Sequence, residues 1–264
     1  MKKTAITFFI SILALGLLSA CGTSEKSSGN GAGGDNKDDK ELVMGTSADY
    51  APFEYVDTEN GDEIIGFDID LANLLAEELG YTVKVKDIEF NGLIAAIQAG
   101  QVDFVMSGMT PTEDRKKNVD FSDVYYTARN MIVAKKGSGI KTVEDLDGKK
   151  LGVQLASIQE DEAEEIGKTV KITVENRNRI PELIQEIKAG RIDAAIIEDT
   201  VAKGYFDNNP DLEGFNLPES EEAGSAIAFP KDSKLTEEFN KVLKEKMENG
   251  EVDKLVVKWF GGEK

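Results

Sequence analysis

One stretch of this chain occurs twice in nearly the same form. Residues 93–103, LIAAIQAGQVD, recur as residues 183–193, LIQEIKAGRID, with a constant offset of 90 residues (183 − 93). Each copy has the apolar spacing of an amphipathic helix and a Gly that ends it. A short apolar run typical of a buried strand follows, at residues 104–106 and 194–197. Helix, turn and strand repeated in both halves predict two similar lobes.

The chain becomes polar where each of these two strands ends. The first strand leads into Ser107, Gly108, Met109 and Thr110, and the second leads into Glu198. Ligands of open α/β sheets gather at the carboxyl ends of the strands. Two such strand ends, one in each half, therefore predict a single ligand shared by the two lobes.

Strands and helices alternate along residues 41–264, which indicates an α/β fold with mostly parallel strands. Two apolar extended segments, residues 125–134 and 224–229, are suited to crossings between the lobes. The C-terminal helical pattern of residues 235–259 is expected to return and cover the first lobe. We therefore expect a two-lobed clamp with two hinge crossings. The first lobe is predicted to take residues 41–128 plus 227–264, and the second residues 129–226.

The N-terminal segment has the features of a signal peptide over residues 1–20. A short basic start precedes an apolar stretch at residues 6–18, which is too short to span a membrane comfortably. The stretch ends in LSACG, which resembles the bacterial lipobox, so Cys21 is expected to become the acylated (palmitate-bearing) first residue. An ordinary signal peptide with a chance Cys is the alternative. Residues 21–40 are polar and Gly-rich, as in a flexible tether. These features predict a protein anchored to the outer face of the cell membrane.

Composition excludes several classes of function. The chain has no His and one Cys, which removes His-based catalytic triads and His-based zinc sites. Its formal net charge of −19 argues against nucleic acid as a partner. It contains no G-x-x-x-x-G-K-[ST] loop, and its one G-x-G-x-x-G run, residues 29–34, lies in the polar Gly-rich segment and does not follow a predicted strand, so no phosphate-binding loop is indicated. No metal and no cofactor is expected.

Two charged residues follow the repeated strands. Arg115 comes shortly after the first strand end, where Thr110 or Thr112 is a plausible N-cap of a helix. A guanidinium beside helix N-terminal N–H groups is a good receptor for a carboxylate. A solvated run of charges is the alternative. Glu198 holds the matching place in the second half, where it either accepts an ammonium group or caps the next helix. Together these residues describe partners for a zwitterion, which is an amino acid.

Three aromatic residues lie near predicted strand ends. Tyr50, Phe53 and Phe90 are each candidates for a pocket wall that stacks on a ligand side chain. Core packing is the commoner role, and we expect it for Phe53.

Three acidic residues lie in the same loops. Asp49, Glu54 and Glu89 would suit a pair of catalytic carboxylates, but nothing in the sequence distinguishes them from surface charge.

Several motifs resemble one family across residues 41–264. They are similar to the polar amino-acid solute-binding proteins of ATP-driven importers, the bacterial extracellular solute-binding proteins of family 3. The motifs that carry this resemblance are residues 45–54 (GTSADYAPFE), 66–71 (GFDIDL) and 107–115 (SGMTPTEDR). A narrower resemblance, to arginine-binding lipoproteins of Gram-positive bacteria, rests on residues 153–160 (VQLASIQE) and 197–206 (IEDTVAKGYF).

The resemblance implies a type II periplasmic-binding-protein fold and a set of binding residues. Arg115 and the region of Thr110 would hold the ligand α-carboxylate, with Ser107 and Gly108 near the α-amino group. Tyr50 and Phe90 would enclose the ligand side chain. The acidic candidates for a guanidinium are Asp49, Glu89 and Glu198. The full set of expected binding residues is Asp49, Tyr50, Phe90, Ser107, Gly108, Met109, Thr110, Arg115, Ser157, Ile158, Gln159 and Glu198.

This chain departs from the family pattern at two of these positions. The family commonly has Thr where Ile158 stands, and a hydroxyl is thereby lost. It commonly has Asp where Glu198 stands. The Glu of this chain keeps the charge, and its longer side chain extends farther towards the amino group.

The resemblance also implies a function. The chain is expected to bind arginine or another basic amino acid and deliver it to a membrane permease. Glutamine, histidine or cystine are alternative ligands. Some proteins of this fold are sensor domains, and others are enzymes such as cyclohexadienyl dehydratases. An enzyme without His or a free Cys would have only carboxylates or Lys to move protons, so we expect no enzyme.

Overall fold

The computed structural model describes residues 40–218 and 224–261. The expected signal peptide, Cys21 and the tether up to residue 39 lie outside the described residues. Lys40, which we expected to end the tether, is instead the first residue of a strand and pairs with Tyr81. Within the described ranges, no helix combines the length and apolar character that crossing a membrane requires.

A five-stranded sheet combines strands of the first half of the chain with one strand from near its C-terminus. We call the part built on this sheet the first lobe. Its strand order is β5-β1-β6-β13-β7, in which β1 pairs parallel with β5 and β6, and β13 pairs antiparallel with β6 and β7. The strands are β1 (Lys40–Thr46), β5 (Tyr81–Asp87), β6 (Phe104–Val105), β7 (Val119–Phe121) and β13 (Ala228–Pro230). A small antiparallel sheet belongs to the same lobe and consists of β2 (Asp49–Tyr50), β3 (Glu54–Asp57) and β4 (Glu63–Ile65).

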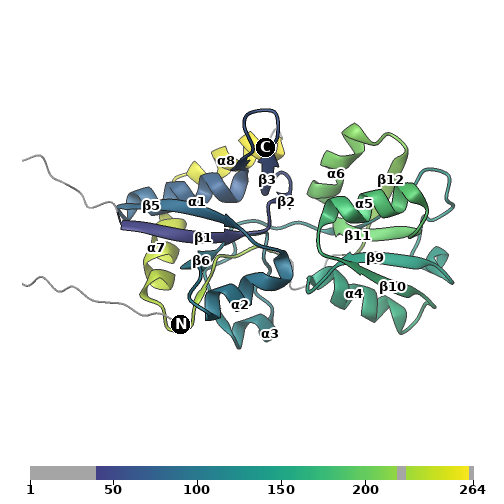
Figure 1. Cartoon of the computed structure of the whole chain (residues 1–264), viewed down its shortest axis with the longest axis horizontal. Helices are drawn as coiled ribbons and strands as arrows, with labels where there is room; N and C mark the ends of the chain where they lie inside the picture. The colour runs from purple at the N-terminus through teal and green to yellow at the C-terminus, as the bar shows by residue number, and fades with distance from the viewer. Residues whose placement is uncertain (1–39, 219–223, 262–264) are drawn as a thin grey trace, which may run out of the picture. The chain divides into compact units, whose positions relative to one another are not determined.

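The helices of the first lobe come from both ends of the described chain. They are α1 (Phe67–Glu78), α2 (Leu93–Gln98), α3 (Glu113–Lys116), α7 (Lys234–Glu248), α8 (Glu251–Phe260) and the 3₁₀ turn η1 (Phe90–Gly92). Figure 1 shows the C-terminal helix α8, in yellow, beside the early helix α1, in blue, and the two are in contact. The expected return of the C-terminal helices to the first lobe is confirmed.

A second five-stranded sheet defines what we call the second lobe. Its order is β10-β9-β11-β8-β12, with β9 parallel to both β10 and β11, and with β8 antiparallel to β11 and β12. Its strands are β8 (Asn130–Lys135), β9 (Lys150–Gln154), β10 (Thr173–Arg177), β11 (Ala194–Glu198) and β12 (Leu212–Asn216). Its helices are η2 (Glu144–Leu146), α4 (Ile158–Gly167), α5 (Ile180–Ala189) and α6 (Asp199–Asn208).

The two copies of the sequence repeat hold equivalent places in the two sheets. The first copy forms α2 and leads into β6 beside β1, and the second forms α5 and leads into β11 beside β9. Asp103, which ends the first copy, donates its N–H to the carbonyl of Val43 at 2.8 Å and accepts from the Val43 N–H at 2.7 Å. Asp193 makes the same pair of bonds with Lys150, at 2.9 and 2.8 Å. The repeated Asp therefore fixes each buried strand against its neighbour.

The chain crosses from the first lobe to the second between β7 and β8, and returns between β12 and β13. The crossings run antiparallel at Tyr126 and Ser225. The N–H of Ser225 donates to the carbonyl of Tyr126 at 2.8 Å, and the N–H of Tyr125 donates to the carbonyl of Ser225 at 2.9 Å. Two extended segments side by side between the lobes are the construction expected of a hinge.

An aromatic cluster forms the core of the first lobe near the crossings. Phe53 is fully buried, with its ring centroid 4.9 Å from that of Phe260 and 5.3 Å from that of Tyr126. The expected core role of Phe53 is confirmed. Since Phe53 lies between β2 and β3, this packing fixes the loop that carries Asp49 and Tyr50.

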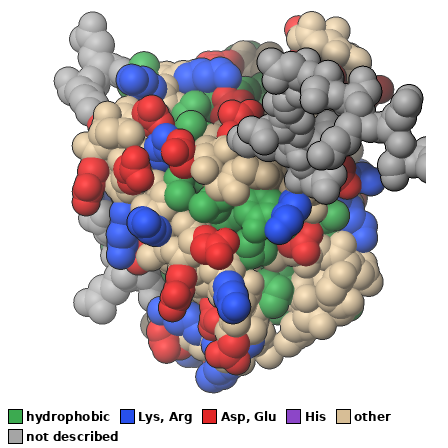
Figure 2. Space-filling view, turned by 90° about the vertical axis from the view of Figure 1, so that its left-hand side faces the viewer, with side chains coloured by type: hydrophobic (Ala, Val, Ile, Leu, Met, Phe, Trp, Pro, Cys, Tyr) green, Lys and Arg blue, Asp and Glu red, His purple; other side chains and the backbone are tan. Residues whose placement is uncertain are grey.

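The surface of the described residues carries charges of both signs. On the face shown in Figure 2, acidic and basic side chains are interspersed around a strip of hydrophobic side chains. The excess of acidic residues in the sequence therefore does not produce a surface of one sign on that face.

Gly66 is a position where the fold leaves no room for a side chain. It is the N-cap of α1 with φ 143°, and a Cβ there would lie 2.1 Å from the carbonyl oxygen of Phe53. That oxygen is part of the backbone and accepts the N–H of Asp68 at 2.9 Å, so it cannot move aside without loss. We expect Gly66→Ala to destabilise the protein by at least about 3 kcal/mol, or to prevent folding, in urea unfolding.

Gly61→Ala is the matched control. Gly61 also has a positive φ, 104°, but a Cβ there meets nothing within 4 Å. We expect this variant to lose only about 1 kcal/mol. Equal losses in the two variants would show that contact with the Phe53 backbone is not the cause.

Candidate functional site

A small pocket lies where strand ends and loops of both lobes meet. Residues of the first lobe come from the ends of β1 and β6, from β2 and β3, and from η1 and α3. Residues of the second lobe come from the end of β9, the start of α4 and the end of β11. The lining residues are Ser47, Asp49, Tyr50, Glu54, Phe90, Ser107, Gly108, Thr110, Arg115, Gln154, Ser157, Ile158, Gln159 and Glu198.

Arg115 enters the pocket from the short helix α3. Thr112 is the N-cap, since its hydroxyl accepts the N–H of Arg115 at 3.3 Å, whereas the sequence left Thr110 and Thr112 as alternatives. The guanidinium donates from Nη1 to the carbonyl of Thr110 at 2.8 Å and from Nη2 to the carbonyl of Ala156 at 2.9 Å. Its Cζ lies 5.3 Å from the ring centroid of Phe90.

These contacts position the guanidinium and leave some of its N–H donors free to bind a ligand. A guanidinium has five N–H donors, and the two bonds to Thr110 and Ala156 use one from each terminal nitrogen. Burial lowers the pKa of Arg115 to about 10, opposed by the nearby carboxylate of Asp161. Arg115 is therefore a cation at neutral pH, held in place and able to bind a carboxylate in the pocket.

Glu198 faces the pocket from the second lobe. It is the last residue of β11 and the N-cap of α6, and its side chain makes no capping hydrogen bond to that helix. The residue is only 7% exposed, and among the described residues its Oε2 has no hydrogen-bond partner. Burial raises the pKa of Glu198 to about 8, against a hydrogen bond from the Tyr50 hydroxyl that lowers it. A buried carboxyl with an unused oxygen is suited to receive a cationic ligand group.

The first-lobe side of the pocket contains a pair of buried acidic residues whose contact the sequence did not indicate. Glu54 lines the pocket and is fully buried, and it hydrogen-bonds with Asp68, which is also fully buried. The interpretation of Glu54 as a surface charge is corrected. Burial raises the pKa of Glu54 well above its usual value, and also raises that of Asp68. Two carboxyls in contact inside a protein are expected to hold one proton between them.

The acid pair orders the first-lobe side of the pocket. Ser107 donates its hydroxyl to Glu54 Oε1 at 2.7 Å and accepts the N–H of Ser47 at 3.0 Å. Asp68 accepts the N–H of Gly108 at 2.9 Å. Because Ser107 and Gly108 are held through Glu54 and Asp68, the strand end at β6 is fixed before any ligand arrives.

The start of α4 forms the second-lobe side of the pocket. Ser157 is its N-cap, accepting the N–H of Glu160 at 3.3 Å and donating to the carbonyl of Gln154 at 2.7 Å. Ile158 and Gln159, the first two helical residues, line the pocket, and Gln159 donates to Asn130 Oδ1 at 2.8 Å. First-turn amides have no acceptor within their own helix, so this end of α4 favours an anionic ligand group.

Tyr50 and Phe90 both line the pocket, and each has a partner within the protein. The Tyr50 ring stacks on Phe53 with centroids 5.6 Å apart, and it lies against Gly108, where a Cβ would come within 3.1 Å. Phe90 lies beneath the guanidinium of Arg115. Both rings are in reach of a ligand in the pocket.

Met109 is the one expected binding residue that the structure does not place at the pocket. It is 1% exposed and its side chain packs with Leu93, Val105 and Val119 in the core beneath α2. The polar run after β6 therefore turns one apolar side chain inward while its neighbours Gly108 and Thr110 line the pocket.

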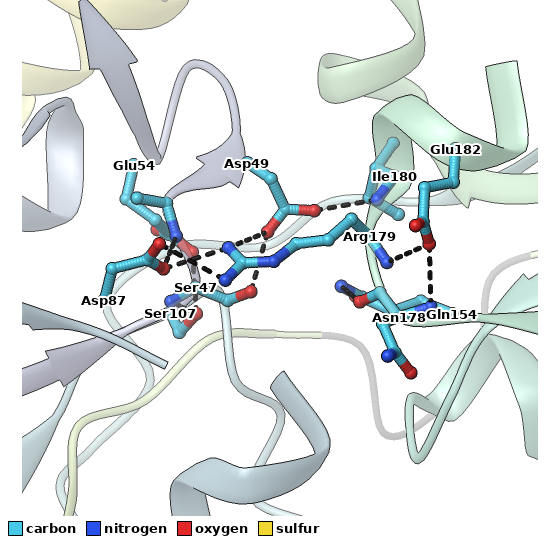
Figure 3. Close-up of polar contacts among 11 residues, drawn as sticks. Ser47, Asp49, Glu54, Asp87, Ser107, Gln154, Asn178, Arg179, Ile180 and Glu182 are labelled. Atoms are coloured by element: carbon cyan, nitrogen blue, oxygen red, sulfur yellow. Dashed lines mark hydrogen bonds and ion pairs between the residues drawn. The ribbon is translucent and has the colours of Figure 1, made fainter. Parts of the chain in front are cut away.

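The acidic candidates for a ligand guanidinium also differ in their positions. Asp49 lines the pocket, but its carboxylate is engaged by Ser47, Arg179 and Ile180 (Figure 3). Glu89 is exposed and is not among the residues that line the pocket.

No group of three or more His, Cys, Asp or Glu residues within the described parts of the chain is arranged to hold a metal ion. The pocket instead offers one cation, a helix N-terminus and several buried carboxyls.

This combination of two α/β lobes and a polar pocket between their strand ends defines a solute-binding protein. Residues 42–262 match the model of the bacterial extracellular solute-binding proteins, family 3, and the chain belongs to that family.

Three similar proteins are binding proteins. The arginine-binding extracellular protein ArtP of Bacillus subtilis is 55% identical, and the match covers 100% of both chains. A solved structure of an ancestral arginine-binding protein bound to arginine is 42% identical with a TM-score of 0.79, covering 84% of this chain and 98% of that one. A solved structure of an ancestral arginine-binding protein bound to glutamine is 42% identical with a TM-score of 0.78, covering 84% of this chain and 98% of that one.

Proposed function

We propose that this chain is the extracytoplasmic substrate-binding subunit of an ATP-driven amino-acid importer, and that it binds L-arginine or another basic amino acid between its lobes. The observation that carries the proposal is that Arg115, from the first lobe, and Glu198, from the second, line one pocket. Arg115 would hold the α-carboxylate, together with the N-terminus of α4. Glu198 would hold the α-ammonium group, with Ser107 and Gly108 beside it.

The charges of the pocket favour a basic side chain on the ligand. Its lining contains three acidic residues, Asp49, Glu54 and Glu198, against the single cation Arg115. An amino acid with a cationic side chain brings two positive groups and one negative group, which complements that lining better than a neutral amino acid does. The relatives described as arginine-binding support the same ligand.

Glutamine, histidine or cystine is the alternative ligand class. A related ancestral protein has been solved with glutamine bound, and Asp49 is already engaged by Arg179 and Ile180. The engagement of Asp49 leaves its carboxylate less available to a ligand guanidinium, and this favours a polar uncharged side chain.

The mechanism is binding and closure without covalent chemistry. A ligand that contacts both lobes shifts the population towards the closed form in proportion to its extra affinity for that form. We infer no catalytic activity, and the buried carboxyls serve as binding and positioning groups. We keep the lobe limits proposed from the sequence. The first lobe takes residues 41–128 plus 227–264 and the second takes residues 129–226, so the chain crosses between the lobes once near residue 128 and once near residue 227.

The remaining parts of the proposal concern the cell surface. Residues 1–20 are a signal peptide, Cys21 carries the lipid anchor, and the tether holds the two lobes near the outer face of the membrane. There the closed form docks on the permease of the importer.

Arginine is expected to raise the melting temperature of a chain of residues 22–264. At one hundred times Kd a ligand adds about 2.7 kcal/mol to the free energy of unfolding. Thermal denaturation with arginine, lysine, glutamine and aspartate measures the effect, with aspartate as the control because its side chain is anionic. A stabilisation by glutamine that arginine does not match would replace the basic ligand with the alternative one.

A further inference from the structure

The two lobes are joined beside the pocket by a side chain that does not line it. Arg179 directly precedes α5 in the second lobe, and its guanidinium reaches Asp87 at the end of β5 in the first lobe. Nη1 donates to Asp87 Oδ1 at 2.9 Å and Nη2 donates to Asp87 Oδ2 at 3.2 Å (Figure 3). This is a two-pronged contact between planar groups, which is the stronger form of an Arg–carboxylate pair.

Asp49 adds a second contact between the same elements. Its Oδ2 accepts the N–H of Ile180, the first residue of α5, at 2.7 Å, and its Oδ1 lies 3.4 Å from Arg179 Nη1. The N-cap of α5 is Arg179, whose side chain makes no capping bond. A carboxylate of the first lobe therefore supplies an acceptor that the helix of the second lobe lacks.

The carboxylates of Asp87 and Asp49 and the backbone of Arg179 are each held in place by neighbouring residues of their own lobe. Asp87 Oδ1 also accepts the N–H of Ala48 at 3.0 Å, and Asp49 Oδ1 accepts the hydroxyl of Ser47 at 2.6 Å. The N–H of Arg179 donates to Glu182 Oε2 at 3.2 Å. The Arg179 side chain is 25% exposed, that of Asp49 is 6% exposed and that of Asp87 is 38% exposed, so water screens the contact with Asp49 less than the contact with Asp87.

We propose that Arg179, with Asp87 and Asp49, fastens the lobes in the closed form and thereby raises the affinity for the ligand. We call these three residues the interlobe clasp. Arg179 and Asp87 do not line the pocket. Asp87 acts on binding only through the fraction of molecules that is closed, and the apparent Kd is the intrinsic Kd divided by that fraction. Arg179 also holds the carboxylate of Asp49, which lines the pocket. The proposal rests on the proposed function for its binding readout.

The first test is calorimetry of Arg179→Ala and Asp87→Asn with arginine and with a second amino acid that the protein binds. We expect each variant to weaken both ligands about three- to tenfold, and Asp87→Asn to weaken them by the same factor. Arg179→Ala also frees Asp49 beside the pocket, so the ratio between the two ligands is read from Asp87→Asn. The double variant is expected to be no weaker than Arg179→Ala alone, since both changes remove one contact. Affinity that does not change would overturn the proposal, and so would a change in the ratio between the two ligands in Asp87→Asn.

Two control variants separate the clasp from general effects. Arg191→Ala removes an Arg–carboxylate pair with Glu186 that lies within the second lobe, and it is expected to leave both affinities unchanged. The charge exchange Arg179→Asp with Asp87→Arg restores an opposite-charge pair across the lobes, and it is expected to recover most of the lost affinity.

A second measurement does not depend on the ligand. Small-angle scattering of the unliganded protein is expected to give a larger radius of gyration for Arg179→Ala than for the unmodified chain. An equal radius contradicts the clasp. If arginine binds to none of the proteins while this difference is observed, the proposed function fails and the clasp stands.

Discussion

Replacing Arg115 with Ala is expected to abolish measurable binding of every α-amino acid. The guanidinium is the single cation that lines the pocket, and its contacts with Thr110, Ala156 and Phe90 hold it in position before a ligand arrives. Removing one partner of a buried charge pair costs about 2–5 kcal/mol, which is about 30-fold to several thousand-fold in Kd. Because the α-carboxylate is common to all amino acids, the loss is expected to be independent of the side chain.

Arg115→Lys is the matched variant for this experiment. It keeps the charge and loses the planar set of donors, so the bonds to Thr110 and Ala156 cannot both persist beside a two-pronged contact with a carboxylate. We expect an intermediate affinity by isothermal titration calorimetry. Unchanged affinity in Arg115→Ala would remove Arg115 from the carboxylate role, even if the protein still binds arginine.

Replacing Glu198 with Gln is expected to weaken binding and to remove most of its dependence on pH. Burial raises the pKa of Glu198 to about 8 in the unliganded protein, so the carboxyl carries a proton at neutral pH. A ligand ammonium group favours the ionised form, and its binding therefore releases that proton. Affinity is expected to rise with pH up to about pH 8, by at most about tenfold per pH unit.

The same shift of pKa has a consequence for stability. The folded-state pKa of Glu198 lies above its ordinary value of 4.5. Its contribution to the stability of the unliganded protein is therefore fully present below pH 4.5 and is lost as the pH rises towards about 8. Glu198→Gln removes this contribution. The buried groups Glu54, Asp68 and Asp49 shift in the same direction, so part of the pH dependence of stability is expected to remain.

Proton release measures the role of Glu198 directly. Titrations of the same ligand at pH 7 in two buffers of different ionisation enthalpy give the number of protons released on binding. We expect close to one proton for the unmodified protein and a clearly smaller number for Glu198→Gln. Equal release in both proteins would assign the proton to another group that faces the pocket, such as Glu54 or Asp49.

Much of the fold follows from the sequence repeat. Each copy of the repeat consists of a helix, a Gly and an Asp directly before a buried strand. The two strands need equivalent places beside a parallel strand, and β6 and β11 occupy these places. The rule that ligands gather at strand ends then indicates the neighbourhoods of Ser107 and Glu198. Local patterns were sufficient here because the helical and strand periodicities are strong in both copies.

The sequence did not predict the features that depend on contacts between distant segments. Glu54 and Asp68 are ordinary acidic residues in the sequence, and only the packing of β3 against the start of α1 buries them together. Asp49, Asp87 and Arg179 lie on three different elements of two lobes, so no local spacing relates them. The direction of the Met109 side chain likewise depends on the core beneath α2, since the residues on both sides of it face the pocket.

The central claim is that one pocket, lined by Arg115 from the first lobe and Glu198 from the second, binds a basic amino acid. A calorimetric screen of residues 22–264 against the twenty amino acids tests it most directly. The account predicts a single site, tightest affinity for arginine or another basic amino acid, and no heat of binding from carboxylic acids that lack an α-amino group. The absence of binding by every amino acid, or equal binding of acids without the amino group, would contradict it.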